Sequence, residues 1–182
     1  MWYAIKTEPG QEMEVCRKLK AFVLNMPAGN FRVLYCVQKK RYLGQWHDER
    51  MRFLPGYLFF VTDKAWSGGR QKMEENAEKI CTDLMSAQRW CTGNSSGYGR
   101  MAFPVRCKEE ELLMKLTKGK DEVGMSQGII RDGVLKIQEG ALTGLESRVK
   151  KIDRHKRKGY ITVRLNDEEM TAEIGLEIKE KT

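Results

Sequence analysis

Apolar and polar positions recur along the first two thirds of the chain in patterns that predict strands and helices in turn. Residues 2–6 form a short, mostly apolar run that predicts a strand. A helix is predicted next, because apolar residues recur at the spacing of one helical face, at Val15, Leu19, Phe22 and Val23. Residues 31–37 then alternate between apolar and polar side chains, which predicts a single half-buried strand.

The middle of the chain predicts a hairpin followed by a buried strand. Residues 39–52 are polar and basic, as in an exposed hairpin, and residues 57–61 belong to the most apolar run of the chain. A turn is expected at Pro55 and Gly56, because proline cannot donate to a central ladder. Further elements are expected at 71–86 (helix), 93–99 (glycine-rich loop), 102–105 (strand) and 108–118 (helix). This order predicts an α+β fold with an N-terminal α/β sandwich on a mostly antiparallel sheet.

The pattern changes after residue 116. Residues 117–128 are polar and hold three glycines, which predicts a linker. Short β-prone runs follow at 134–137, 149–152 and 160–165. Their spacing of about ten residues predicts a small β-barrel, and the alternating apolar residues of the last run favour a permanent barrel over a segment that refolds. We therefore expect two domains, 1–116 and 129–182, joined by a linker at 117–128.

Charge adds the first indication of a partner. The chain has 182 residues, with 33 lysines and arginines against 25 acidic residues, so its net charge is +8. An excess of this sign favours nucleic acid or a membrane surface as partner. A membrane is disfavoured, because no apolar run reaches the ~20 residues of a bilayer span and no basic amphipathic helix is predicted. The first residues do not have the pattern of a signal peptide, so we expect a cytoplasmic protein.

Enzymatic and metal-binding functions find little support among the residues. Histidine occurs only at His47 and His155, and no phosphate-binding glycine motif is present. The five cysteines lack zinc-site spacing and predict reduced, buried thiols, at Cys16, Cys36, Cys81, Cys91 and Cys107. We therefore expect a protein that is not an enzyme and that holds neither a metal nor a cofactor.

A dense group of cations lies between two of the predicted C-terminal strands. It consists of seven basic residues and one histidine, namely Arg148, Lys150, Lys151, Arg154, His155, Lys156, Arg157 and Lys158, and Asp153 is the only acid among them. Such side chains at a hairpin tip can neutralise phosphates, and arginine can also bond or stack on unpaired bases. The alternative is a solvated hairpin that keeps a sheet edge soluble. The charge density favours contact with nucleic acid.

A second candidate surface is aromatic. Trp2 and Tyr3 open the chain, and the sequence FLPGY follows at 53–57. A rigid Pro-Gly turn can present neighbouring apolar side chains at the rim of a sheet, where aromatic anchors dominate binding energy. The pattern alone favours the alternative, in which these side chains belong to the core.

These motifs together resemble the NusG family of transcription elongation factors. The resemblance is carried by the Trp2-Tyr3 start, by FLPGY at 53–57 and by GALTGLE at 140–146, in this order. Ala141 and Ser147 stand where the family commonly has proline and glycine. The resemblance implies an N-terminal NGN domain and a C-terminal KOW barrel. It also implies docking on the clamp helices of the RNA polymerase largest subunit, with contacts from Trp2, Tyr3, Phe53, Leu54 and Tyr57.

The basic run at 153–158 is similar to the specialised LoaP branch of antiterminators, which implies nascent structured RNA as the partner of the KOW domain. The expected function is therefore that of a monomer that binds polymerase and an RNA hairpin, close to the DNA of the transcription bubble, and promotes processive transcription of specific operons. One alternative is a general NusG-type factor whose KOW domain recruits a ribosomal protein or Rho. Another is a ribosome-associated KOW protein that binds RNA and never meets polymerase.

Overall fold

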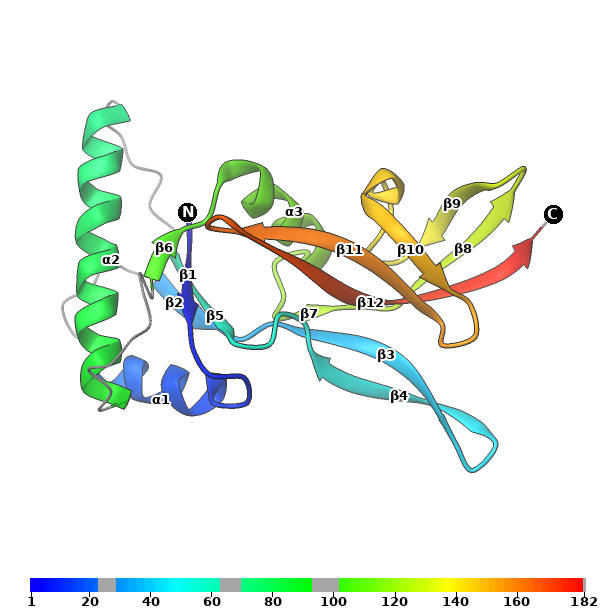
Figure 1. Cartoon of the computed structure of the whole chain (residues 1–182), viewed down its shortest axis with the longest axis horizontal. Coiled ribbons are helices and arrows are strands. Elements are labelled where there is room, and N and C mark those ends of the chain that lie inside the picture. Colours follow the sequence, from blue (N-terminus) through cyan, green and yellow to red (C-terminus); the bar gives the residue numbers. More distant parts are fainter. Residues whose placement is uncertain (23–28, 63–69, 93–101, 182) are drawn as a thin grey trace. The chain divides into compact units, whose positions relative to one another are not determined.

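A computed structural model describes residues 1–22, 29–62, 70–92 and 102–181 (Figure 1). The chain divides into two compact units, one formed by Met1–Val33 and Pro55–Glu110 and the other by Leu34–Leu54 and Glu111–Thr182. Each unit therefore combines two separate stretches of sequence. The described part is α+β, with three helices and three sheets.

The first unit is built on a four-stranded antiparallel sheet. Its strands lie in the order β2 (Gly29–Arg32), β5 (Tyr57–Thr62), β1 (Trp2–Lys6) and β6 (Ala102–Pro104). The helices α1 (Glu12–Phe22) and α2 (Arg70–Thr92) contact each other and this sheet (Figure 1). The two central strands are apolar on both faces, so their buried side chains form the core, including Ile5, Leu58, Phe59 and Phe60. The helix α3 (Cys107–Thr117) begins in this unit's sequence and ends in that of the second unit.

The second unit contains a long hairpin of β3 (Tyr35–Tyr42) and β4 (Gln45–Arg52). The short strand β7 (Glu122–Val123) pairs with β3 in parallel. Leu43 and Gly44 connect the two long strands, and both have positive φ angles, 50° and 79°. Two residues of this conformation match the twist of the flanking strands, which is why a two-residue loop closes the hairpin.

A five-stranded sheet completes the second unit. Its strands lie in the order β10 (Val149–Asp153), β11 (Lys158–Leu165), β12 (Glu168–Lys181), β8 (Ser126–Arg131) and β9 (Val134–Glu139), with a 3-10 turn at Glu146–Arg148. The first half of β12 pairs antiparallel with β11 and its second half pairs parallel with β8. Among the described strands no pairing joins β9 to β10, so the observed order is that of an open sheet. Alternating inward residues of β11 and β12 form the core, including Ile161, Val163, Leu165, Ile174 and Leu176.

Most predicted elements are confirmed, and the differences have physical reasons. The single strand predicted at 31–37 is wrong, because β2 and β3 belong to different sheets. Val33 and Leu34 are both buried, and two consecutive inward side chains interrupt a strand's alternation. Strand β7 and the start of β8 fall within 117–128, while the domain boundaries at 116 and 129 stay a prediction. The loop predicted at 93–99 lies outside the described residues. None of the described helices is long and apolar enough to cross a membrane.

Burial makes one thiol of the second unit resistant to ionisation. Cys36 on β3 has no exposed surface, and this burial raises the pKa of its thiol from 9.0 to about 11. The folded state thus favours the neutral thiol. We expect the free energy of unfolding to fall by about 2–3 kcal/mol as pH rises from about 9 to about 11, because only the unfolded chain releases this proton readily. Denaturant titrations across this pH range measure the effect.

Cys36→Ala supplies the control for this prediction. This variant should lose less free energy of unfolding at alkaline pH, because the contribution of the Cys36 thiol is gone. The contribution of Tyr3 should remain, since burial raises the pKa of its hydroxyl to about 12. Thiol alkylation mapped by mass spectrometry gives a second measurement, because the thiolate is the reactive form. The exposed Cys107 should react at pH 8.5 while Cys36 stays unmodified. Equal reaction of both thiols in the folded chain would contradict the assignment.

Candidate nucleic-acid interface

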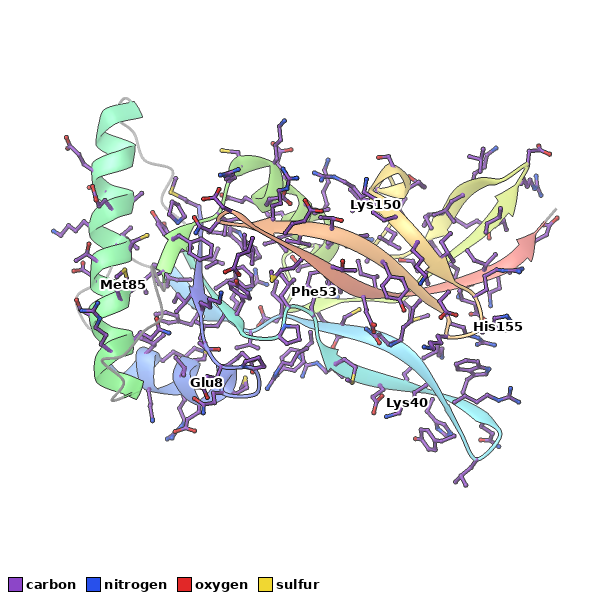
Figure 2. The ribbon with its side chains drawn as sticks, viewed as in Figure 1. Glu8, Lys40, Phe53, Met85, Lys150 and His155 are labelled. Carbon is purple, nitrogen blue, oxygen red and sulfur yellow. The ribbon has the colours of Figure 1, made fainter. Side chains whose placement is uncertain are left out.

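The predicted cation group forms the turn and flanks of the β10–β11 hairpin. Asp153 and Lys158 pair at the end of the ladder, and the Arg157 N–H donates to the Arg154 carbonyl at 3.3 Å. The Asp153 carboxylate accepts the backbone N–H of Lys156 at 2.9 Å. The one acid of the cluster therefore closes the turn through the backbone, and it forms no ion pair with the described basic side chains around it. Figure 2 places Lys150 and His155 along this hairpin.

The basic side chains of the hairpin divide into an exposed set and a supporting set. Five side chains are exposed, namely Lys150, Lys151, Arg154, His155 and Lys156. Arg157 and Lys158 are half-buried and form ion pairs with carboxylates of β12: Arg157 with Glu177 at 2.9 Å and Lys158 with Glu173. The structure therefore brings seven of the eight predicted side chains to one hairpin, while the half-buried Arg148 lies just before it at the end of the 3-10 turn. Two of the seven already hold the turn against β12.

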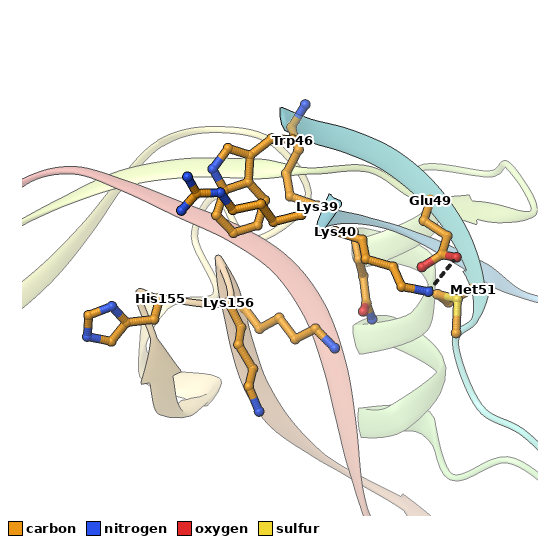
Figure 3. Close-up of a pocket in the computed structure, with 10 residues that line it drawn as sticks. Lys39, Lys40, Trp46, Glu49, Met51, His155 and Lys156 are labelled. Atoms are coloured by element: carbon orange, nitrogen blue, oxygen red, sulfur yellow. Dashed lines mark hydrogen bonds and ion pairs between the residues drawn. The ribbon is translucent and has the colours of Figure 1, made fainter. Parts of the chain in front are cut away.

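The β3–β4 hairpin packs against this turn within the second unit. The Arg157 guanidinium lies 4.2 Å from the centroid of the Trp46 ring, and the Gln38 side chain donates to the Glu173 carbonyl at 3.3 Å. A cleft of about 520 Å³ lies between the two hairpins (Figure 3). Sequence reasoning did not predict that the β3–β4 hairpin would line a cleft with the basic turn. The sequence feature that could have indicated it is the basic character of residues 39–52, with a tryptophan in the middle.

The predicted aromatic surface is buried throughout. Exposed fractions are 0–4% for all of its side chains, namely Trp2, Tyr3, Phe53, Leu54 and Tyr57. In the first unit the Trp2 ring meets Phe59 edge-on, with ring centroids 5.6 Å apart, and Arg32 covers it at 5.4 Å. These rings thus build the core in this conformation. Their role as polymerase contacts stays a prediction.

The comparisons with known proteins decide the family. The profile described as "Transcription termination factor nusG" matches residues 1–111, which is more than half of the chain. The chain belongs to the NusG family. A solved structure, "Domain interaction in Thermotoga maritima NusG", is similar over 95% of this chain and 92% of that chain, with 16% sequence identity and a TM-score of 0.44. No curated protein matches the chain.

Membership of the NusG family places the chain among transcription factors that act with RNA polymerase. The matched region contains both parts of the aromatic motif, the Trp2-Tyr3 start and FLPGY at 53–57. The resemblance to the family is thereby confirmed. Within the described residues, no group of three or more histidine, cysteine or acidic side chains is arranged to hold a metal ion.

A buried carboxylate holds the Pro55–Gly56 turn of this NusG family chain. Glu12 has no exposed surface, and its Oε1 atom accepts the Gly56 N–H at 2.7 Å. Its two oxygens also accept the Gly10 N–H at 3.1 and 3.0 Å, and the Gly56 carbonyl accepts the Thr7 N–H at 2.7 Å. The turn is therefore fixed to the start of α1. Sequence reasoning missed Glu12, because acids in a first helical turn, here Glu12 and Glu14, are also what an ordinary helix shows.

The glycine loop at 140–146 fixes the end of β9 against the start of β8. Gly140 has a φ of 108°. Two residues further on, the Leu142 N–H donates to the Ser126 Oγ atom at 3.0 Å. Ser126 itself is fully buried. Glu146 accepts the Ile137 N–H at 3.3 Å and so ties the loop to β9. This loop leads directly into the 3-10 turn and β10, so its geometry positions the basic hairpin.

Proposed function

We propose that this NusG family chain is a non-enzymatic antitermination factor of the LoaP type. It binds RNA polymerase through its N-terminal domain and nascent structured RNA through a C-terminal KOW domain, and it promotes processive transcription of specific operons. The supporting observation is the set of five exposed basic and histidine side chains on the β10–β11 hairpin, whose only acid is engaged by the backbone of the turn.

The chemistry of this hairpin suits the phosphates of a folded RNA. Its exposed cations are free to displace counterions, which produces affinity that falls steeply with salt. Structured RNA is recognised by shape and by unpaired bases, and a narrow hairpin tip can reach both backbone and loop. A second attachment to polymerase raises the effective concentration of the RNA-binding domain near the nascent transcript. Two weak contacts then restrict action to transcripts that carry the RNA element.

The polymerase contact is supported by membership of the family and by the Glu12-held turn. We propose that the clamp helices of the largest subunit meet this face of the N-terminal domain. Because Trp2, Tyr3 and Tyr57 are buried, they act in this proposal by fixing the backbone beneath the contact surface. Substituting them would therefore disturb folding as well as binding, and the RNA contact offers the sharper test.

The test removes three exposed cations of the hairpin in the full chain. We expect K150A/R154A/K156A to bind a labelled RNA stem–loop about 10- to 30-fold more weakly at physiological salt, and the slope of log affinity against log salt to fall by about 2–3. Fluorescence anisotropy over a salt series measures both quantities. The reason is the loss of phosphate contacts, which act independently of sequence.

A matched variant separates this effect from a change in net charge. K108A/K115A/K118A removes three exposed lysines on and just after α3, and it should leave RNA affinity nearly unchanged. Equal losses in the two variants, or an unchanged affinity in the hairpin variant, would contradict the RNA contact. Unchanged affinity would favour the general NusG-type alternative, in which the C-terminal domain recruits a protein.

A further inference from the structure

The cleft between the β3–β4 hairpin and the β10–β11 turn combines positive charge with an aromatic wall. Its volume is about 520 Å³, within the range of roughly 300–1,000 Å³ typical of small-ligand sites. Ten residues line it: Gln38, Lys39, Lys40, Arg41, Trp46, Glu49, Met51, His155, Lys156 and Lys158. Trp46 of the first hairpin and Lys156 of the turn are among them (Figure 3).

The charges of the cleft favour an anionic ligand. Five lysine and arginine residues line it against one carboxylate, that of Glu49. This carboxylate is already engaged by Lys40, whose Nζ atom lies 3.0 Å away (Figure 3). Lys39 pairs with Asp48 at 2.8 Å, outside the lining. Arg41 and Lys156 form no ion pair within the part of the chain that the structure describes, so their charges are available to a ligand.

The ring of Trp46 supplies a flat apolar surface next to these charges. Trp46 is half-buried, and the Arg157 guanidinium holds it at 4.2 Å from the ring centroid. Arg157 is itself fixed by Glu177 at 2.9 Å. The ring is therefore held in place before any ligand arrives, which reduces the entropy cost of stacking on it. Bases stack on aromatic side chains in this way whatever their identity, because every base has a π face.

We propose that this cleft binds an unpaired nucleotide of the RNA held by the β10–β11 hairpin. The base lies against Trp46, and Arg41 and Lys156 bind the flanking phosphates. The proposal rests on the proposed RNA contact and adds a subsite for single-stranded RNA beside the stem. An acidic peptide would use the cations but would gain little from the tryptophan, so the combination of ring and charge favours a nucleotide.

The test compares two RNA probes on the full chain. One is a stem–loop with a single-stranded oligouridine tail, and the other is a blunt RNA duplex without unpaired bases. We expect Trp46→Leu to weaken binding of the tailed probe about tenfold, as stacking of one base contributes roughly 1–3 kcal/mol. Binding of the blunt duplex should not change. Trp46→Phe keeps a ring and should retain most of the affinity for the tailed probe.

Tyr42→Leu is the matched control, because Tyr42 is an exposed aromatic of the same hairpin outside the lining of the cleft. It should affect neither probe. Arg41→Ala removes a charge without touching the core, and it should weaken binding of the tailed probe alone. If Trp46→Leu fails to fold, the affinities of Arg41→Ala and Trp46→Phe for the tailed probe can still be compared with that of the wild-type chain, and these two variants then decide the test.

The outcomes separate the cleft from the hairpin. If Trp46→Leu and Arg41→Ala bind the tailed probe as wild type does, while K150A/R154A/K156A loses both probes, the cleft assignment is wrong and the RNA contact stands. If the wild-type chain binds neither probe, the proposed function fails and the cleft proposal with it. Competition by polyglutamate as effective as that by oligouridine would show a general anion site and overturn the assignment of a nucleotide.

Discussion

Glu12→Ala is expected to lower the free energy of unfolding by about 2–3 kcal/mol, because it leaves the buried Gly56 N–H without an acceptor and removes the charged acceptor of the Gly10 N–H. Both N–H groups now donate to the carboxylate at 2.7–3.1 Å. Water cannot easily replace the carboxylate at the Gly56 N–H, since the Glu12 side chain has no exposed surface. Denaturant unfolding followed by circular dichroism measures the loss.

Two further variants test whether the hydrogen bonds are the cause. Glu12→Gln keeps one acceptor oxygen of the same shape, so its loss should be smaller than that of Glu12→Ala. Glu14→Ala removes an exposed acid from the same helix, whose partner is Lys18 at 2.9 Å, and it should change stability little. A loss from Glu12→Ala no greater than that from Glu14→Ala would contradict the assignment.

The same substitution bears on function. Glu12 fixes the Pro55–Gly56 turn, which belongs to the motif that the NusG family resemblance assigns to polymerase. A chain that remains folded but has a loosened turn should lose affinity for polymerase before it loses affinity for RNA. Measuring both affinities for Glu12→Gln therefore separates the two proposed surfaces more cleanly than substituting a buried ring.

Elements whose pattern is contiguous could be predicted from the sequence. The apolar face of α1 and the apolar run of β5 lie within single segments, and both elements are where the periodicity predicts. Strand β12 was not predicted, because charged residues make up half of its sequence and obscure its pattern. Ala172, Ile174 and Leu176 nevertheless point inward at every second position, which is the alternation that a strand requires.

The candidate site was predictable only as far as its residues are neighbours in sequence. The basic residues at 148–158 are adjacent along the chain, so their place on one hairpin could be predicted from charge and flanking strands. The cleft could not, because Trp46 and Lys156 come together only through the packing of two distant hairpins. The pairing of Arg157 and Lys158 with acids of β12 depends on the same packing.

The aromatic motif shows where pattern and resemblance point to different roles. The pattern alone predicted that these side chains are core residues, and the structure buries all of them. The resemblance assigned them to a polymerase contact, which no feature of the structure tests. The two interpretations are compatible if the buried rings fix the backbone that lies beneath the polymerase contact. Hydrophobicity along a sequence cannot distinguish that arrangement from an ordinary core.

Gly140→Ala should have a larger effect than Glu12→Ala, a loss of about 4–5 kcal/mol from the stability of the second unit. Gly140 has a φ of 108°, which side chains rarely adopt. An added Cβ atom would also lie 2.3 Å from the Met125 carbonyl oxygen and 2.4 Å from the Ser126 Cα atom. Both contacts are with backbone, so no rotamer change can relieve them.

The loss should be local and should remove RNA binding. Moving Ser126 breaks the hydrogen bond to the Leu142 N–H and releases the loop that leads into the basic hairpin. Limited proteolysis should therefore cut the second unit of Gly140→Ala first, and the anisotropy of a labelled RNA stem–loop should show no saturable binding.

Gly144→Ala is the matched control in the same loop. Its φ of 74° is also positive, but an added Cβ atom there meets nothing within 4 Å. Only the backbone penalty of about 1–2 kcal/mol remains, so Gly144→Ala should fold and bind RNA. Similar losses from both glycines would show that conformation, not the close approach of β8, limits this loop.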